Sequence, residues 1–171
     1  SYNDFGDLRM GSDGPEEYLK KLDVIREGGK DVIVVNKDSL VQVPSGYSQL
    51  NLMQKFRFAV SENWDVQYAF HYSETSEYSR YDRHIRYRNG LPRYGEWKYG
   101  PQKWLMNQLT LTHNSTGGLY DQMSIRLAQQ GFEESRIDRD INKSTRHIKT
   151  EKVGAYSLNM DFSKTISDHG K

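Results

Sequence analysis

The chain has 171 residues, no cysteine and nearly balanced charge, with 24 Lys and Arg against 23 Asp and Glu. The net charge of +1 argues against nucleic acid as a partner, and the lack of cysteine excludes a disulfide framework and a thiolate metal site. The mean hydropathy of −0.89, without an apolar run near the roughly 18 residues of a spanning helix, excludes a helical membrane protein. It leaves open a protein that crosses the membrane with strands.

The first residues predict short elements. Residues 2–10 alternate weakly and form a short strand that ends at the Gly and Pro cluster of residues 11–15. Residues 16–22 suit one or two helical turns. Residues 24–35 are rich in β-branched side chains around a paired glycine, which predicts a small hairpin. Residues 36–46 are polar and are expected to be a loop.

A long hairpin is predicted over residues 46–73, with a tight turn at 61–63. Successive side chains of a strand point to opposite faces, and here one face is almost wholly apolar, interrupted only by Gln54. That face carries Leu50, Leu52, Phe56, Phe58, Val60, Trp64, Val66, Tyr68, Phe70 and Tyr72. The opposite face carries Asn51, Lys55, Arg57, Asp65, Gln67 and His71.

The second half continues this pattern with longer connections. Residues 74–102 lose the alternation and are predicted as a long connection. A strand over 104–111, a polar turn at 114–118 and a returning strand over 123–128 follow. After a charged loop at 133–150, a last strand is expected over 156–162, and the end, Ser167 to Lys171, has turn composition.

The lengths of the connections favour one environment for this all-β fold. The turns expected at 61–63 and 114–118 are short, whereas residues 11–46, 74–102 and 133–150 form long loops. Outer-membrane barrels have short turns on one side and long external loops on the other, and strands of roughly 10 to 14 residues suit a tilted bilayer crossing. We therefore predict an antiparallel meander of long hairpins that is part of a transmembrane β-barrel. A soluble sandwich with one apolar face is the alternative.

Three segments resemble a known family: residues 4–11 (DFGDLRMG), 46–58 (GYSQLNLMQKFRF) and 99–104 (YGPQKW). Together they are similar to barrel strands and loop edges of TonB-dependent outer-membrane receptors of Gram-negative bacteria. The resemblance spans essentially the whole chain but only part of such a receptor. Family members hold a plug inside a barrel of 22 strands, whereas residues 1–171 contain about six barrel strands and no plug.

The resemblance implies a role in the bacterial outer membrane. Such a receptor takes up a bulky, scarce nutrient of the ferric siderophore, haem or cobalamin class. Its partners are the membrane lipid and the TonB energy-coupling system, which acts through the plug region absent from this chain. No motif for a particular cargo maps onto a numbered position, so the resemblance transfers no ligand-binding residue and no cofactor.

The loop between Glu77 and Lys98 is the most chemically loaded segment. Positive side chains outnumber negative ones there, and they alternate with aromatic rings. Guanidinium groups bind carboxylates and phosphates in pairs of hydrogen bonds, and aromatic faces stack on planar ligands, so an anionic, ring-bearing small ligand suits this loop. Stacking within the loop, or contact with lipopolysaccharide phosphates, is the alternative. The candidate ligand-binding residues are Arg80, Tyr81, Arg83, His84, Arg86, Tyr87, Arg88, Tyr94 and Trp97.

The aromatic residues, the histidines and the possible catalytic residues lead to three further expectations. Aromatic residues near strand ends are candidates for the interfacial girdles of a barrel: Trp64, Tyr72, Trp104, Tyr120 and Tyr156. The five histidines lack the close spacing of a metal site. His71, Ser73 and Asp65 share one predicted strand and could not form a nucleophilic triad, and no phosphate-binding loop is present, so we do not expect an enzyme.

The sequence therefore supports two functions. The first is a fragment of an outer-membrane active transporter. The second is a soluble, secreted all-β module that binds carbohydrate on a platform of Tyr and Trp side chains. If the first holds, the isolated chain has unpaired strand edges and an apolar face without its lipid, and we expect it to self-associate.

Overall fold

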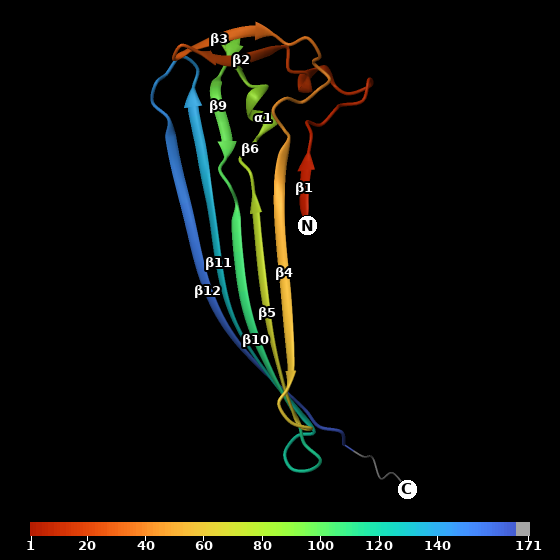
Figure 1. Ribbon diagram of the computed structural model, residues 1–171. Helices are drawn as coiled ribbons and strands as arrows, with labels where there is room; N and C mark the ends of the chain where they lie inside the picture. Colours follow the sequence, from red (N-terminus) through yellow and green to blue (C-terminus); the bar gives the residue numbers. More distant parts are fainter. Residues whose placement is uncertain (167–171) are drawn as a thin grey trace. The chain divides into compact units, whose positions relative to one another are not determined.

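The computed structural model describes residues 1–166 and is all-β, with long antiparallel strands (Figure 1). Strands hold 62% of the residues and helices 4%, which confirms the predicted fold class. The turn expected at Ser167 to Lys171 lies outside the described residues. The elements are β1 (Tyr2–Phe5), a 3-10 helix η1 (Glu16–Tyr18), β2 (Leu22–Glu27), β3 (Lys30–Val35), β4 (Tyr47–Ala59), β5 (Trp64–Thr75), β6 (Tyr78–Ser79), α1 (Tyr81–His84), β7 (Tyr87–Arg88), β8 (Leu91–Pro92), β9 (Tyr94–Tyr99), β10 (Lys103–Asn114), β11 (Gln122–Asp140) and β12 (His147–Ser163).

The chain divides into two compact units. The first unit comprises residues 1–50, 73–103 and 133–152, and the second comprises 51–72, 104–132 and the residues from 153 onward. The main sheet has the strand order β1-β4-β5-β10-β11-β9-β6, and β12 pairs with β11 (Figure 1). Among the described residues, β11 is the only strand on which β12 pairs.

The predicted small hairpin of the first unit is present as β2 and β3. Its register runs from Leu22 opposite Val35 to Glu27 opposite Lys30. The turn places Gly28 and Gly29 at φ values of 55° and 79°, a conformation that glycine adopts without steric penalty. The helical turns expected over residues 16–22 are reduced to η1, because Leu22 already belongs to β2.

Residues 74–102, predicted as a long connection, do link β5 to β10, but they are not irregular throughout. This segment contains α1 and the short strands β6 to β8, and it ends in β9, which pairs with the far end of β11. Lys98 lies opposite Ile137 and Glu96 opposite Arg139. Trp97 and Ile137 are buried, so the segment contributes directly to the small core of the first unit.

The expected loop at 133–150 is also mostly strand. β11 continues to Asp140 and β12 begins at His147, so the connection is residues 141–146. The charged side chains that suggested a loop pair across the two strands instead. Lys152 Nζ lies 2.9 Å from a carboxylate oxygen of Glu133, and the Ser135 and Thr150 hydroxyls are 2.9 Å apart. Such cross-strand pairs stabilise a sheet whose side chains are polar.

The second unit contains the two predicted long hairpins. The turn between β4 and β5 is closed by Val60 N, which donates to Trp64 O at 2.9 Å. The turn between β10 and β11 is closed by Ser115 N, which donates to Asp121 O at 2.8 Å. Among the described residues of this unit, Ala69 is the one hydrophobic side chain classed as buried, so the strands form a thin layer here.

Candidate functional site

The predicted ligand-binding residues lie in the first unit, from Arg80 just before α1 to Trp97 of β9, but they do not form one exposed surface. Trp97 is the centre of one group and is only 7% exposed. The guanidinium carbons of Arg80 and Arg83 lie 5.2 and 5.3 Å from the centroid of its ring. Arg80 also donates to both carboxylate oxygens of Asp82, at 2.8 and 2.7 Å. These groups are therefore engaged in stacking within the loop, which was the alternative to ligand binding.

His84 and Tyr81 also have structural partners. His84 Nε2 lies 3.0 Å from the carbonyl oxygen of Trp97, so this nitrogen carries the proton and donates. Burial, together with the nearby Lys20 ammonium, lowers the pKa of His84 and keeps the ring neutral at neutral pH. The Tyr81 hydroxyl donates to the carbonyl oxygen of Tyr18 at 2.6 Å, and burial raises the pKa of Tyr81.

The remaining predicted residues are more accessible. Arg86, Tyr87 and Arg88 are exposed at the hairpin of β7 and β8. In residues 1–166, neither Arg86 nor Arg88 has a carboxylate partner. Tyr94 is half-buried, and the guanidinium carbon of Arg93 lies 4.9 Å from the centroid of its ring. Of the predicted set, the hairpin tip is thus the part available to a ligand.

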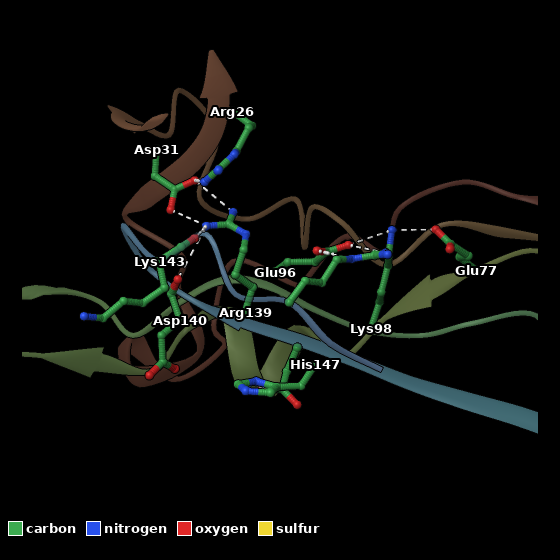
Figure 2. A network of polar contacts seen from close by, with 11 residues as sticks. Arg26, Asp31, Glu77, Glu96, Lys98, Arg139, Asp140, Lys143 and His147 are labelled. Atoms are coloured by element: carbon green, nitrogen blue, oxygen red, sulfur yellow. Dashed lines mark hydrogen bonds and ion pairs between the residues drawn. The ribbon is translucent and has the colours of Figure 1, made fainter. Parts of the chain in front are cut away.

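Sequence analysis missed a buried charge of the first unit, the Asp31 carboxylate of β3 (Figure 2). It is fully buried and accepts hydrogen bonds from Arg139 Nη1 and Nη2 at 2.6 and 2.8 Å. Arg26 Nη1 and the backbone N–H of Asn142 donate to it at 2.9 and 2.7 Å. The hydrogen bonds from Arg139 are the main reason that the pKa of Asp31 lies well below its usual range. This carboxylate joins the β2–β3 hairpin to β11 and to the connection 141–146.

A second ion-pair cluster surrounds Glu96 of β9 (Figure 2). Arg146 donates to both of its carboxylate oxygens, at 2.8 and 3.0 Å, and Lys98 Nζ lies 3.0 Å away. Lys98 also pairs with Glu77 at 2.5 Å. Partial burial opposes ionisation of Glu96, but the hydrogen bonds from Arg146 and Lys98 outweigh it and lower the pKa of Glu96. The carboxylate is therefore charged at neutral pH.

The second unit presents large apolar side chains to the outside. Along β4, β10, β11 and β12 one face carries apolar side chains that are between 42% and 59% exposed, and Tyr156 on the same face is 83% exposed. A shallow groove of about 510 Å³ runs among Tyr68, Leu109, Leu127 and Leu158. Within residues 1–166, no second layer of the chain covers this apolar face, whose exposed members are Leu52, Phe56, Phe58, Leu109, Leu127, Tyr156, Leu158, Met160 and Phe162.

The predicted girdle aromatics separate into groups. Trp64 and Tyr120 lie with His113 and Phe162 in a row of rings next to the short turns. Adjacent ring centroids in this row are 4.3, 5.8 and 5.6 Å apart. Tyr156 lies along β12, away from its ends, and Tyr72 is half-buried near the end of β5. Of the five predicted girdle residues, Trp64 and Tyr120 are therefore the two that lie together in one row.

Trp104 lies on the face of the strands opposite to the apolar face. Its Nε1 donates to Gln130 Oε1 at 3.3 Å, and its ring centroid lies 4.7 Å from that of His71. Because side chains alternate along β10, Trp104 and Leu109 point to opposite sides of the sheet. This face also carries the ion pairs Arg57–Asp65 and Arg126–Asp161, at 2.6 and 2.8 Å. Trp104 thus belongs to the polar face of the strands.

Neither a helix long and apolar enough to span a membrane nor a cluster of metal-ligating side chains occurs in residues 1–166. No model of a protein family matches the chain, and comparisons with characterised proteins and with solved structures find no match.

Proposed function

We propose that this chain is part of the barrel of a TonB-dependent outer-membrane receptor of a Gram-negative bacterium. The receptor takes up a bulky, scarce nutrient of the ferric siderophore, haem or cobalamin class. The observation that carries the proposal is the uncovered apolar face of the second unit, with Phe58 59% and Phe162 57% exposed. Removing such side chains from water is worth about 1.5–3 kcal/mol each, so a face this rich in them favours contact with hydrocarbon.

The opposite face of the same strands supports this assignment. It carries polar side chains and the Arg57–Asp65 and Arg126–Asp161 ion pairs, as expected where a barrel strand borders a wet interior. The proposed partners are the lipid of the outer membrane and the TonB system. Coupling to TonB rests on the sequence resemblance alone, because no residue of this chain corresponds to the plug.

The carbohydrate-binding alternative is less well supported. It requires flat aromatic side chains that a sugar can reach in the long loop. Trp97 is buried beneath Arg80 and Arg83, and Trp104 contacts His71 and Gln130. Tyr87 is 41% exposed at the hairpin of β7 and β8, but Trp97, the tryptophan of the long loop, cannot form a platform with it.

Fluorescence quenching by brominated phosphatidylcholine tests the proposal. The Trp97→Phe/Trp104→Phe variant retains only Trp64, and the Trp64→Phe/Trp104→Phe variant retains only Trp97. We expect lipid bromine to quench Trp64 strongly and Trp97 weakly, because Trp64 belongs to the row of rings and Trp97 is buried in the first unit. Equal quenching of both, or a stable monomer of the full chain in buffer without detergent, would exclude a membrane barrel.

A further inference from the structure

Two adjoining hollows open in the first unit around the ion pairs of Figure 2. Their volumes are about 490 and 290 Å³, within or near the range of small-molecule sites. They share Arg26 and Ser144 and are together called the arginine hollow. The larger part is lined also by Gly95, Glu96, Arg139 and Arg146, and the smaller by Gly29, Lys30, Asp31, Asn142 and Lys143.

The lining of the arginine hollow is strongly cationic. Five positive side chains, three arginines and two lysines, line the hollow together with the two carboxylates of Asp31 and Glu96, which gives an excess of three positive charges. Both carboxylates have a lowered pKa and remain ionised at neutral pH. A network that served only to hold the loops together would need no such excess. The excess is the charge complement of a multivalent anion.

Several hydrogen-bond donors in the hollow are held in place and have no partner within the described residues. Arg26 uses Nη1 for Asp31, which leaves Nε and Nη2 unoccupied. Arg146 uses Nε and Nη2 for Glu96, which leaves Nη1 unoccupied. The Ser144 hydroxyl adds a neutral donor. Fixed guanidinium groups lose little freedom when they bind an oxyanion, so these donors are suited to bind one.

The floor of the hollow is rigid. Arg139 is held by Asp31 and by the carbonyl oxygens of Asp140 and Lys143, at 3.4 and 3.1 Å. Its guanidinium group lies against Gly95, where an added Cβ would come within 2.5 Å of Nη2. Only a residue without a side chain leaves room for this arrangement. The segment 141–146 and the β2–β3 hairpin are thereby held around the hollow.

We propose that the arginine hollow binds a small ligand that carries two or more carboxylate or phosphate groups. The proposal adds the chemical class of the ligand to the proposed function. It rests on that function only where it identifies the ligand with the transported nutrient. The anion site itself does not require membrane insertion.

Titration calorimetry of the full chain in a maltoside detergent, with pyrophosphate and propane-1,2,3-tricarboxylate as probes and acetate for comparison, tests this inference. We expect both multivalent anions to bind at one site and acetate at least tenfold more weakly. Arg26→Gln is expected to weaken binding about tenfold or more, because a charged hydrogen-bonding partner is lost while Asp31 keeps Arg139. Ser144→Ala, a milder change, is expected to weaken binding severalfold.

Lys37→Gln is the matched control, since it removes one charge from an exposed position outside the hollow. It should leave the affinity unchanged. Equal weakening by Arg26→Gln and Lys37→Gln, or equal affinity for acetate and pyrophosphate, would overturn the inference, because either result indicates general attraction of anions. If only pyrophosphate binds, the ligand class narrows to phosphates. Lipid quenching of Trp64 is independent of all these results, so failure of the anion site and failure of the transporter proposal are separable.

Discussion

Replacing Asp31 by Asn should release the β2–β3 hairpin from β11. The carboxylate is fully buried and binds two arginines, and Arg139 is only 7% exposed, so its guanidinium group would lose its counterion without gaining water. Breaking a buried ion pair by removing one partner destabilises by about 3–5 kcal/mol. Because Arg26 is 40% exposed and can be hydrated instead, we expect the lower end, about 3 kcal/mol.

Amide hydrogen exchange in detergent measures this effect locally. A loss of about 3 kcal/mol corresponds to exchange on the order of a hundredfold faster for β2 and β3, with β10 of the second unit unchanged. Asp38→Asn is the control. Asp38 pairs with Arg9 at 2.7 Å at an exposed site, where water screens the two charges and the pair contributes little to stability. Equal acceleration by both substitutions would refute the reasoning that burial makes the Asp31 pair strong.

The same variant has a pH signature. The folded pKa of Asp31 is lowered, so its contribution to stability is present above the ordinary carboxyl pKa and is lost as pH falls toward the folded value. Protection of β2 and β3 against exchange should therefore decline below about pH 4 in the natural chain. In Asp31→Asn this decline should be much smaller. An identical acid dependence in the two proteins would show that other groups cause it.

Four further substitutions test the faces and the packing. Phe58→Asp should impair insertion into phosphatidylcholine vesicles by about 2 kcal/mol or more, whereas Lys55→Asp on the opposite face should have a small effect, and equal damage would contradict the facial assignment. Gly95→Ala should displace Arg139 and reduce the thermal stability of the first unit by about 1–3 kcal/mol, measured by heat denaturation; no change would mean that the guanidinium group moves freely. Trp97→Ala should remove the stacking partner of the α1 segment and lower the free energy of unfolding by about 3–5 kcal/mol. The change should be detected as a loss of near-ultraviolet circular dichroism.

Local patterns made the hairpins predictable. The turn at Gly28 and Gly29 and the alternation from Leu50 to Tyr72 depend on near neighbours only, and the structure places strands there. The extension of β11 and β12 was missed because its side chains are charged and show no apolar alternation. Their strand conformation depends on partners across the sheet, such as Lys152 for Glu133, which no local pattern shows.

The sequence could show which residue types the candidate site contains, but it could not show which of them are in contact. The Arg and Tyr content of residues 80–97 drew attention to β9 and its neighbours, but it could not show which of the arginines are paired within the chain. Asp31 gave no signal, because its partner Arg139 is 108 positions away in the sequence and the pair forms only when β3 and β11 meet. The arginine hollow depends on the same long-range contact, as it combines side chains of β2, β9, β11 and residues 141–146.

The one-sided pairing of β12 has a practical consequence for handling this polypeptide. Its 17 residues offer a row of backbone donors and acceptors that β11 cannot satisfy, and any extended chain that drifts alongside can dock there. The yield of monomeric protein should therefore depend less on thermal stability than on how well this edge of β12 is protected. Dilution, rapid refolding and a cosolvent that binds the edge are expected to raise it.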